Sequence, residues 1–136
     1  GACTDSAWAA QYHLPGTFAP IADYTMLRTC VETAEQLGLP YHVGNLLSSD
    51  RFYGDDGDMP DGWKANNAWA KMGVLAVEME AAALYMNAAR AGKRALAICT
   101  VSDQLVRQEF TTSEERQTVF TQMMQLALET AIKLEK

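Results

Sequence analysis

Two short apolar runs, each followed by polar and acidic residues, stand out in the second half of the chain. They occupy residues 74–77 and 95–101. A short apolar run bounded by polar residues is typical of a buried strand. Between them, residues 80–91 are rich in helix-favouring alanine, leucine and methionine, and Gly92 can end that helix in the left-handed conformation. The pattern predicts a strand–helix–strand unit in a largely parallel sheet, and hence an α/β fold.

The first third of the chain shows a similar alternation of elements. Residues 1–6 are typical of a strand end, and residues 7–20 predict a loop because they contain prolines and glycine without a clear period. Asp23 can cap a helix that Gly38 ends, and residues 42–47 are typical of a strand. The apolar positions of this helix fall on one face: Leu27, Val31, Ala34 and Leu37.

Later segments predict two more helices. Residues 63–72 form a plausible short helix, and residues 104–110 are a polar stretch that can move. Thr112 and Glu115 fit a capping box at the start of a long helix over residues 113–134. We expect its core-facing side to consist of Val119, Phe120, Met123, Met124, Ala127 and Ala131.

Composition narrows the class of protein. The 136 residues carry a net charge of −6 without a basic cluster, so the positive surface that nucleic-acid binding needs is not expected. No apolar run approaches the roughly 18 residues of a membrane span, so no membrane partner is expected. Cys3, Cys30 and Cys99 lack metal-ligand spacing and suit buried thiols in a reducing cytoplasm. We therefore expect a cytoplasmic globular domain.

Several catalytic motifs do not occur in the sequence. It contains no glycine-rich dinucleotide motif, Walker loop, zinc-ligand pattern or nucleophilic serine elbow. This argues against a nucleotide cofactor, a metal and a covalent serine or cysteine mechanism. The groups that remain are carboxylates, above all Glu78, Glu80 and Asp103, and an arginine, Arg116. This set suits cleavage of an N-glycosidic bond through an oxocarbenium-like state.

Carboxylates gather where the two apolar runs end. Glu78 and Glu80 follow the first run, and Ser102 and Asp103 follow the second. Parallel sheets bind ligands beyond the carboxyl ends of their strands, which favours a binding site here. The alternative is helix capping, because acidic residues favour a helix N-terminus and Glu80 opens one.

Further motifs extend along nearly the whole chain. They are Gly-Ala-Cys-Thr-Asp-Ser at residues 1–6, Val-Gly-Asn-Leu at 43–46, Phe-Tyr at 52–53, Val-Glu-Met-Glu-Ala-Ala at 77–82, Ile-Cys-Thr-Val-Ser-Asp at 98–103 and Thr-Thr-Ser-Glu-Glu-Arg at 111–116. In this combination the sequence closely resembles the bacterial, hexameric-type purine nucleoside phosphorylases.

This resemblance implies a fold and an activity. We expect a mixed, largely parallel central sheet flanked by helices, with residues 1–136 as the C-terminal portion of a single nucleoside phosphorylase domain whose N-terminal part is absent from this chain. The implied reaction is reversible phosphorolysis of purine (deoxy)ribonucleosides to free base and (deoxy)ribose 1-phosphate, a pentosyltransferase reaction of purine salvage. Phosphate is a co-substrate and no cofactor is expected. The implied partners are the N-terminal half and further copies in a hexamer, a trimer of dimers.

The resemblance also implies a role for each site residue. Asp103 gives a proton to the leaving purine, and Arg116 pairs with Asp103 and assists. Glu80 holds the ribose hydroxyls while Met79 packs on the ribose. The pocket is completed by Phe52, which stacks on the base, by Val77 and Glu78 near sugar and base, and by Ser102 beside the base. An aspartate carboxyl has an ordinary pKa of about 3.9, so donation requires burial or a shared proton.

Three alternatives stay open. Uridine phosphorylases share the Glu-Met-Glu element but lack an acid like Asp103. Nucleosidases for methylthioadenosine or adenosylhomocysteine keep a Ser-Asp pair and use water instead of phosphate. An inactive assembly fragment is the third alternative, because exposed strand edges favour association.

Overall fold

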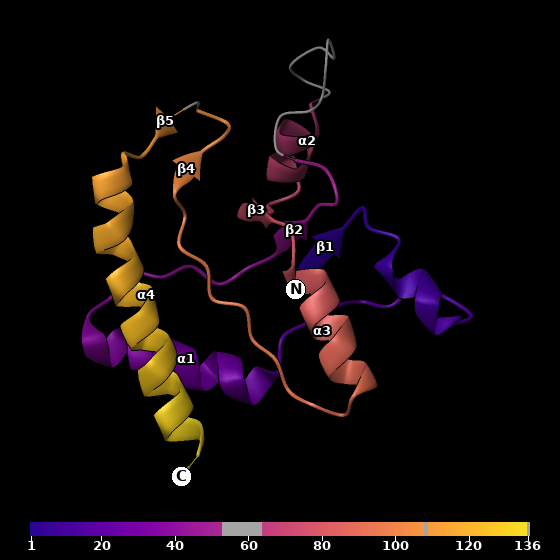
Figure 1. Cartoon of the computed structure of the whole chain (residues 1–136), viewed down its shortest axis with the longest axis horizontal. Helices are drawn as coiled ribbons and strands as arrows, with labels where there is room; N and C mark the ends of the chain where they lie inside the picture. Colours follow the sequence, from indigo (N-terminus) through magenta and orange to yellow (C-terminus); the bar gives the residue numbers. More distant parts are fainter. Residues whose placement is uncertain (53–63, 108, 136) are drawn as a thin grey trace. The chain divides into compact units, whose positions relative to one another are not determined.

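A computed structural model describes residues 1–52, 64–107 and 109–135, without the side chains of residues 113 and 115–119. The chain forms two compact units (Figure 1). The first combines Gly1–Ile21 with Gly44–Ala95, and the second combines Ala22–Val43 with Leu96–Lys136. The assignment of residues 1–136 to part of a single domain stays a prediction.

The first unit is built on a three-stranded parallel sheet. Its strand order is β1-β2-β3, so the central strand β2 pairs with both neighbours. Leu47 of β2 lies opposite Cys3 and Val77 and is 3% exposed. The strands are short: β1 is Ala2–Thr4, β2 is Leu46–Ser48 and β3 is Ala76–Glu78. The predicted parallel sheet is confirmed.

Helix α3 (Ala81–Arg90) follows β3 and packs against β1 and β2. Its buried residues are Ala81, Ala82, Tyr85 and Met86, and the two alanines let its first turn lie close to the strands. Gly92 has a φ of 63° just after the helix, as predicted. The unit also contains α2, Ala65–Lys71, within the predicted helical segment.

The predicted loop over residues 7–20 contains a short 3₁₀ helix, η1 (Trp8–Tyr12). Aromatic contacts hold this turn against α3. The Tyr12 hydroxyl donates to the Asn87 side chain, and the Arg90 guanidinium lies 5.7 Å from the centroid of the Tyr12 ring. These contacts order a segment whose sequence lacks a helical period.

The second unit is a pair of packed helices, α1 (Tyr24–Leu37) and α4 (Ser113–Leu134). The Asp23 side chain accepts from the N–H of Met26 at 2.9 Å, and Gly38 follows α1 with a φ of 64°, so both predicted ends are confirmed. Buried Cys30, Ala34 and Leu126 form the core between the helices.

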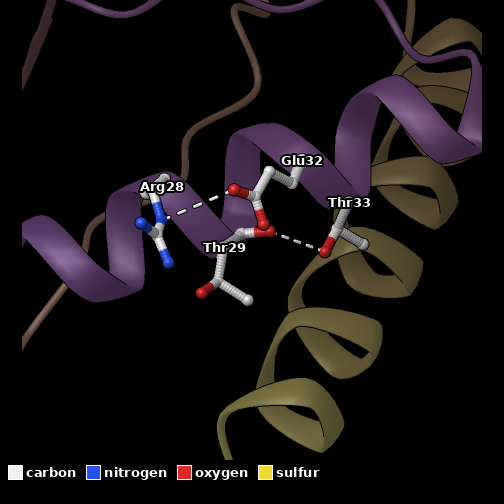
Figure 2. A network of polar contacts seen from close by, with 4 residues as sticks. All are labelled: Arg28, Thr29, Glu32 and Thr33. Carbon is white, nitrogen blue, oxygen red and sulfur yellow. Dashed lines mark hydrogen bonds and ion pairs between the residues drawn. The ribbon is translucent and has the colours of Figure 1, made fainter.

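Polar contacts complete the α1–α4 interface. In Figure 2 the Thr33 hydroxyl donates to the Thr29 carbonyl, 2.7 Å away, on the side of α1 beside α4. The same hydroxyl accepts from Lys133 Nζ of α4 at 3.0 Å. Arg28 and Glu32 form an exposed ion pair along α1, which contributes little to stability.

The strand predicted over residues 95–101 is wrong, because these residues have no regular secondary structure and join no sheet ladder. Leu96 and Ile98 instead pack against the α1–α4 core. Two side chains of this apolar run thus contribute to helix packing and not to a sheet. The start of the strand predicted over residues 42–47 is also wrong, because β2 begins only at Leu46 and ends at Ser48.

Part of the polar stretch over residues 104–110 pairs as a short ladder, within itself and with the residue before it. β4 (Asp103–Gln104) and β5 (Glu109–Phe110) form a two-stranded antiparallel sheet, with Asp103 opposite Phe110. The ladder involves backbone groups, so the polar side chains do not oppose it.

The bounds of α4 match the prediction, but its packed face does not. Leu126 and Thr130 are buried, whereas Phe120 is 39% and Met124 53% exposed. Apolar residues occur on more than one side of this helix, so periodicity alone did not select the side that meets α1. The side chains of Val119 and Glu115 lie outside the described residues. Among the described helices, none is long and apolar enough to cross a membrane.

Leu126 is only 8% exposed, so Leu126→Ala opens a cavity in the core between α1 and α4. It should destabilise this unit by about 2–4 kcal/mol. Leu128 of the same helix is 66% exposed, so Leu128→Ala should cost less than about 0.5 kcal/mol. Urea unfolding of both variants measures the difference. Equal losses would contradict the assigned packing face.

Burial raises the pKa of the Cys30 thiol, and a hydrogen bond with Thr130 opposes this rise only partly. Cys99 is exposed. Alkylation requires the thiolate, so iodoacetamide at pH 8 should modify Cys99 well before Cys30. Mass spectrometry after timed quenching gives the order, and denaturant should remove the protection of Cys30. Faster labelling of Cys30 in the folded protein would refute its buried placement.

Candidate functional site

The carboxyl ends of β2 and β3 bring two polar side chains together. Ser48 ends β2 and Glu78 ends β3, and the parallel register places these residues opposite each other. Ser48 is 3% exposed, and Glu78 is half-buried. A buried polar group costs free energy unless it is hydrogen-bonded, so both side chains need partners.

Both oxygens of the Glu78 carboxylate are occupied by such partners. The Ser48 hydroxyl donates to Oε1. The backbone N–H groups of Glu80 and Ala81 donate to Oε2 at 2.7 and 2.6 Å. Ser48 Oγ in turn accepts from the N–H of Ala82 at 2.8 Å. Together Ser48 and Glu78 satisfy three amides at the start of α3, which intrahelical bonds leave free.

Helix capping, the alternative reading of the strand-end acids, therefore applies to Glu78 and not to Glu80. Glu80 is the residue before α3, but its side chain makes no capping bond. Its carboxylate is exposed, and within the part of the chain that the structure describes it accepts one bond, from the Met79 N–H at 3.2 Å. Glu80 thus retains the capacity to bind a ligand.

Three other predicted residues lie near these strand ends along the chain. Met79, between the two acids, is 37% exposed, and Val77 of β3 is half-buried. Phe52 lies four residues beyond β2 and is 73% exposed. An exposed aromatic ring after a strand end offers a face for a base. Tyr53 lies outside the described residues.

Asp5, which the sequence analysis did not select, shapes the segment between β2 and Phe52. Its carboxylate accepts from the Ser49 hydroxyl and the Asp50 N–H, both at 2.9 Å. Slight burial raises the pKa of Asp5, but these two hydrogen bonds, its own N–H and the Arg51 charge outweigh it and lower that pKa. The signal was available: Asp5 follows β1, at the same sheet edge as the other acids.

Ser102 and Asp103 lie in the second unit, where the β4–β5 pair holds them. The Ser102 hydroxyl donates to Asp103 Oδ2 at 2.8 Å, and the Thr111 N–H donates to Oδ1 at 3.3 Å. The Thr111 hydroxyl donates to the Ser102 carbonyl at 2.6 Å. These bonds fix the direction of the Asp103 carboxylate, and Thr111 is a second residue that the sequence analysis did not select.

The remaining predicted site residue, Arg116, lies in the first turn of α4. Its side chain falls outside the described residues, so its pairing with Asp103 stays a prediction. Across the described ranges, no three or more histidine, cysteine, aspartate or glutamate side chains gather in a way that could hold a metal ion.

Glu78→Ala should destabilise the protein by about 1–3 kcal/mol, because it leaves two helix amides and the Ser48 hydroxyl without their acceptor. Glu80→Ala is the matched control and should cost less than about 0.5 kcal/mol. Thermal or urea unfolding compares the two. The assignment of the cap fails if Glu80→Ala costs as much as Glu78→Ala.

Comparison with known proteins places these residues in a family. The model of the phosphorylase superfamily matches residues 3–134. Two curated relatives from different strains of Clostridium perfringens, both named purine nucleoside phosphorylase DeoD-type, are 50% identical over 117 residues. This match covers 86% of this chain and 47% of each relative, so the chain spans about half the length of the curated relatives it matches.

A solved structure shows the same fold. It is purine nucleoside phosphorylase from Toxoplasma gondii in complex with immucillin-H, with a TM-score of 0.78 at 18% identity. The match covers 98% of this chain and 53% of that one. The expected α/β fold is therefore confirmed, and the chain belongs to the phosphorylase superfamily.

Proposed function

We propose that this chain supplies the nucleoside-binding and proton-donating residues of a purine nucleoside phosphorylase. The reaction splits purine (deoxy)ribonucleosides with phosphate, giving free base and (deoxy)ribose 1-phosphate. The observation that carries the proposal is the contrast at the β3–α3 junction: Glu78 is bound to the helix, while the Glu80 carboxylate stays exposed. The names of the Clostridium relatives support the choice of reaction.

In this proposal the β3–α3 junction binds the sugar and Phe52 binds the base. A carboxylate accepts hydrogen bonds from two neighbouring hydroxyls, so Glu80 holds the ribose. Met79 packs on the ribose, and Val77 and the backbone at Glu78 line the pocket. The Phe52 ring stacks on the purine.

Asp103 acts at the leaving group. As the bond from the anomeric carbon to the purine breaks, positive charge develops on the sugar, and a phosphate oxygen then bonds to that carbon. The purine takes a proton at its imidazole nitrogen and leaves neutral, with Asp103 as the donor. Hydrogen bonds from Ser102 and Thr111 orient the Asp103 carboxylate. Arg116 stabilises that carboxylate once the proton has left.

The proposal extends to partners and setting. Phosphate is a co-substrate, and neither cofactor nor metal takes part. The active form is a homo-oligomer, a hexamer arranged as a trimer of dimers, and its location is the cytoplasm. Cys3, Cys30 and Cys99, all described by the structure, form no disulfide, which is compatible with a reducing compartment.

Release of hypoxanthine from inosine should occur with phosphate and not without it, in the protein purified in its native form. Asp103→Asn should lower kcat by about 10²–10⁴-fold, because the amide cannot donate the proton in the same way. Glu109→Gln, an exposed change on the same β4–β5 pair, is the control and should leave kcat unchanged. Release without phosphate would indicate a hydrolase and contradict the proposal, as would full turnover by Asp103→Asn.

A further inference from the structure

Ser48 is a buried polar residue in the strand next to the proposed sugar site. Its side chain lies at the end of the central strand β2 and is 3% exposed. An alanine would fill nearly the same space without a polar atom that must be satisfied. The hydroxyl therefore needs an explanation beyond packing, and its two partners supply one.

The direction of both hydrogen bonds at Ser48 follows from the chemistry of the partners. The Ala82 N–H can only donate, so Ser48 Oγ is the acceptor of that bond, 2.8 Å long. The hydroxyl hydrogen is then directed to Glu78 Oε1. Ser48 consequently bridges the first turn of α3 and the carboxylate of Glu78 in one fixed orientation.

This bridge acts on the backbone that carries Glu80. With Oε1 held by Ser48, Oε2 of Glu78 is directed at the N–H groups of Glu80 and Ala81. These bonds hold the turn between β3 and α3, where Glu80 has a φ of −128° and a ψ of −28°. In this turn the Glu80 side chain does not cap its own helix and stays exposed.

We propose that Ser48 is a positioning residue for ribose recognition, acting through Glu78 on Glu80. The inference rests on the proposed function, since it concerns the group that binds the ribose hydroxyls. It adds two assignments to that function. The Glu78 carboxylate serves the protein backbone instead of the ligand, and a serine on the neighbouring strand determines how well Glu80 meets the sugar.

If Ser48 acted only as a helix cap, its removal would have a different effect from the one expected of a positioning residue. Loss of a cap lowers the melting temperature and reduces the amount of folded protein, which changes the response to every ligand alike. Loss of positioning weakens only interactions made through Glu80, because a displaced carboxylate no longer meets the hydroxyls in the right geometry. Comparison of a nucleoside with an analogue that lacks those hydroxyls separates the two.

The test is the KM for inosine set against the inhibition constant of 2′,3′-dideoxyinosine, measured in the protein in its native form. Ser48→Ala should raise the KM for inosine about tenfold or more and leave the inhibition constant of the analogue within about twofold. Ser48→Thr keeps the hydroxyl and should bring the KM for inosine most of the way back to the wild-type value. The proposal would be overturned if Ser48→Ala left the ratio of the inosine KM to the dideoxyinosine inhibition constant at the wild-type value, whether because neither constant changed or because both shifted equally.

Ser49→Ala is the matched control. Ser49 is the next residue and is also buried, but its hydroxyl donates to Asp5 and not to Glu78. It should lower the melting temperature while the ratio for the two ligands stays at the wild-type value. A change of that ratio as large as in Ser48→Ala would count against a specific role for Ser48.

A second variant covers the case in which Ser48→Ala does not fold at the assay temperature. Glu78→Gln keeps the side-chain volume and one acceptor for the helix amides, but its second terminal atom is a donor and cannot accept from Ser48. It should reduce the preference for inosine over the dideoxy analogue, and an unchanged preference would overturn the proposal. Failure of the proposed function would look different, since the wild-type protein would then release no base with phosphate.

Discussion

The hydrogen bonds between the Glu78 carboxylate and the start of α3 are the constraint on which the first unit depends. Glu78 ends β3, accepts from the amides of Glu80 and Ala81, and receives the hydroxyl of Ser48 from β2. A negative charge at a helix N-terminus is favourable, because the free amides there carry partial positive charge. The same three bonds join two strands to a helix, so the path of the chain at this edge of the sheet is narrowly defined.

This constraint separates two acids that are only two residues apart. In a continuing strand, residues 78 and 80 would share a face of the sheet. The strand ends at Glu78, and the turn into α3 begins at once, so their side chains meet different surroundings. Glu78 is half-buried and bonded to the backbone, while Glu80 is exposed. A short acidic motif thereby supplies both a fixed turn and a group for binding.

Local signals were sufficient to predict much of the fold. Asp23, Gly38 and Gly92 mark helix ends through interactions within a few residues, and the long helix α4 has the predicted bounds. Strand lengths depend on a partner elsewhere in the chain, which a local pattern does not contain. For this reason residues 42–45 and 95–101 were predicted as parts of strands although they join no ladder.

The candidate site was predicted only in part, again because a local pattern does not contain the contacts with distant residues. The sequence indicated acids at strand ends, but the usual capping rule favoured Glu80, the residue at the helix start. The structure gives the cap to Glu78, because β2 brings Ser48 opposite it. Ser48 and Thr111 could not be selected from sequence, since each matters through contact with a residue distant in the chain or across a turn.

A crystal structure of the protein with a purine nucleoside bound tests the central claim most directly. The account predicts that the Glu78 carboxylate stays on the amides of Glu80 and Ala81 and on the Ser48 hydroxyl. It also predicts that the Glu80 carboxylate accepts hydrogen bonds from the ribose hydroxyls. A structure in which Glu78 leaves the helix to bind the ribose, or in which Glu80 lies away from the nucleoside, would contradict it.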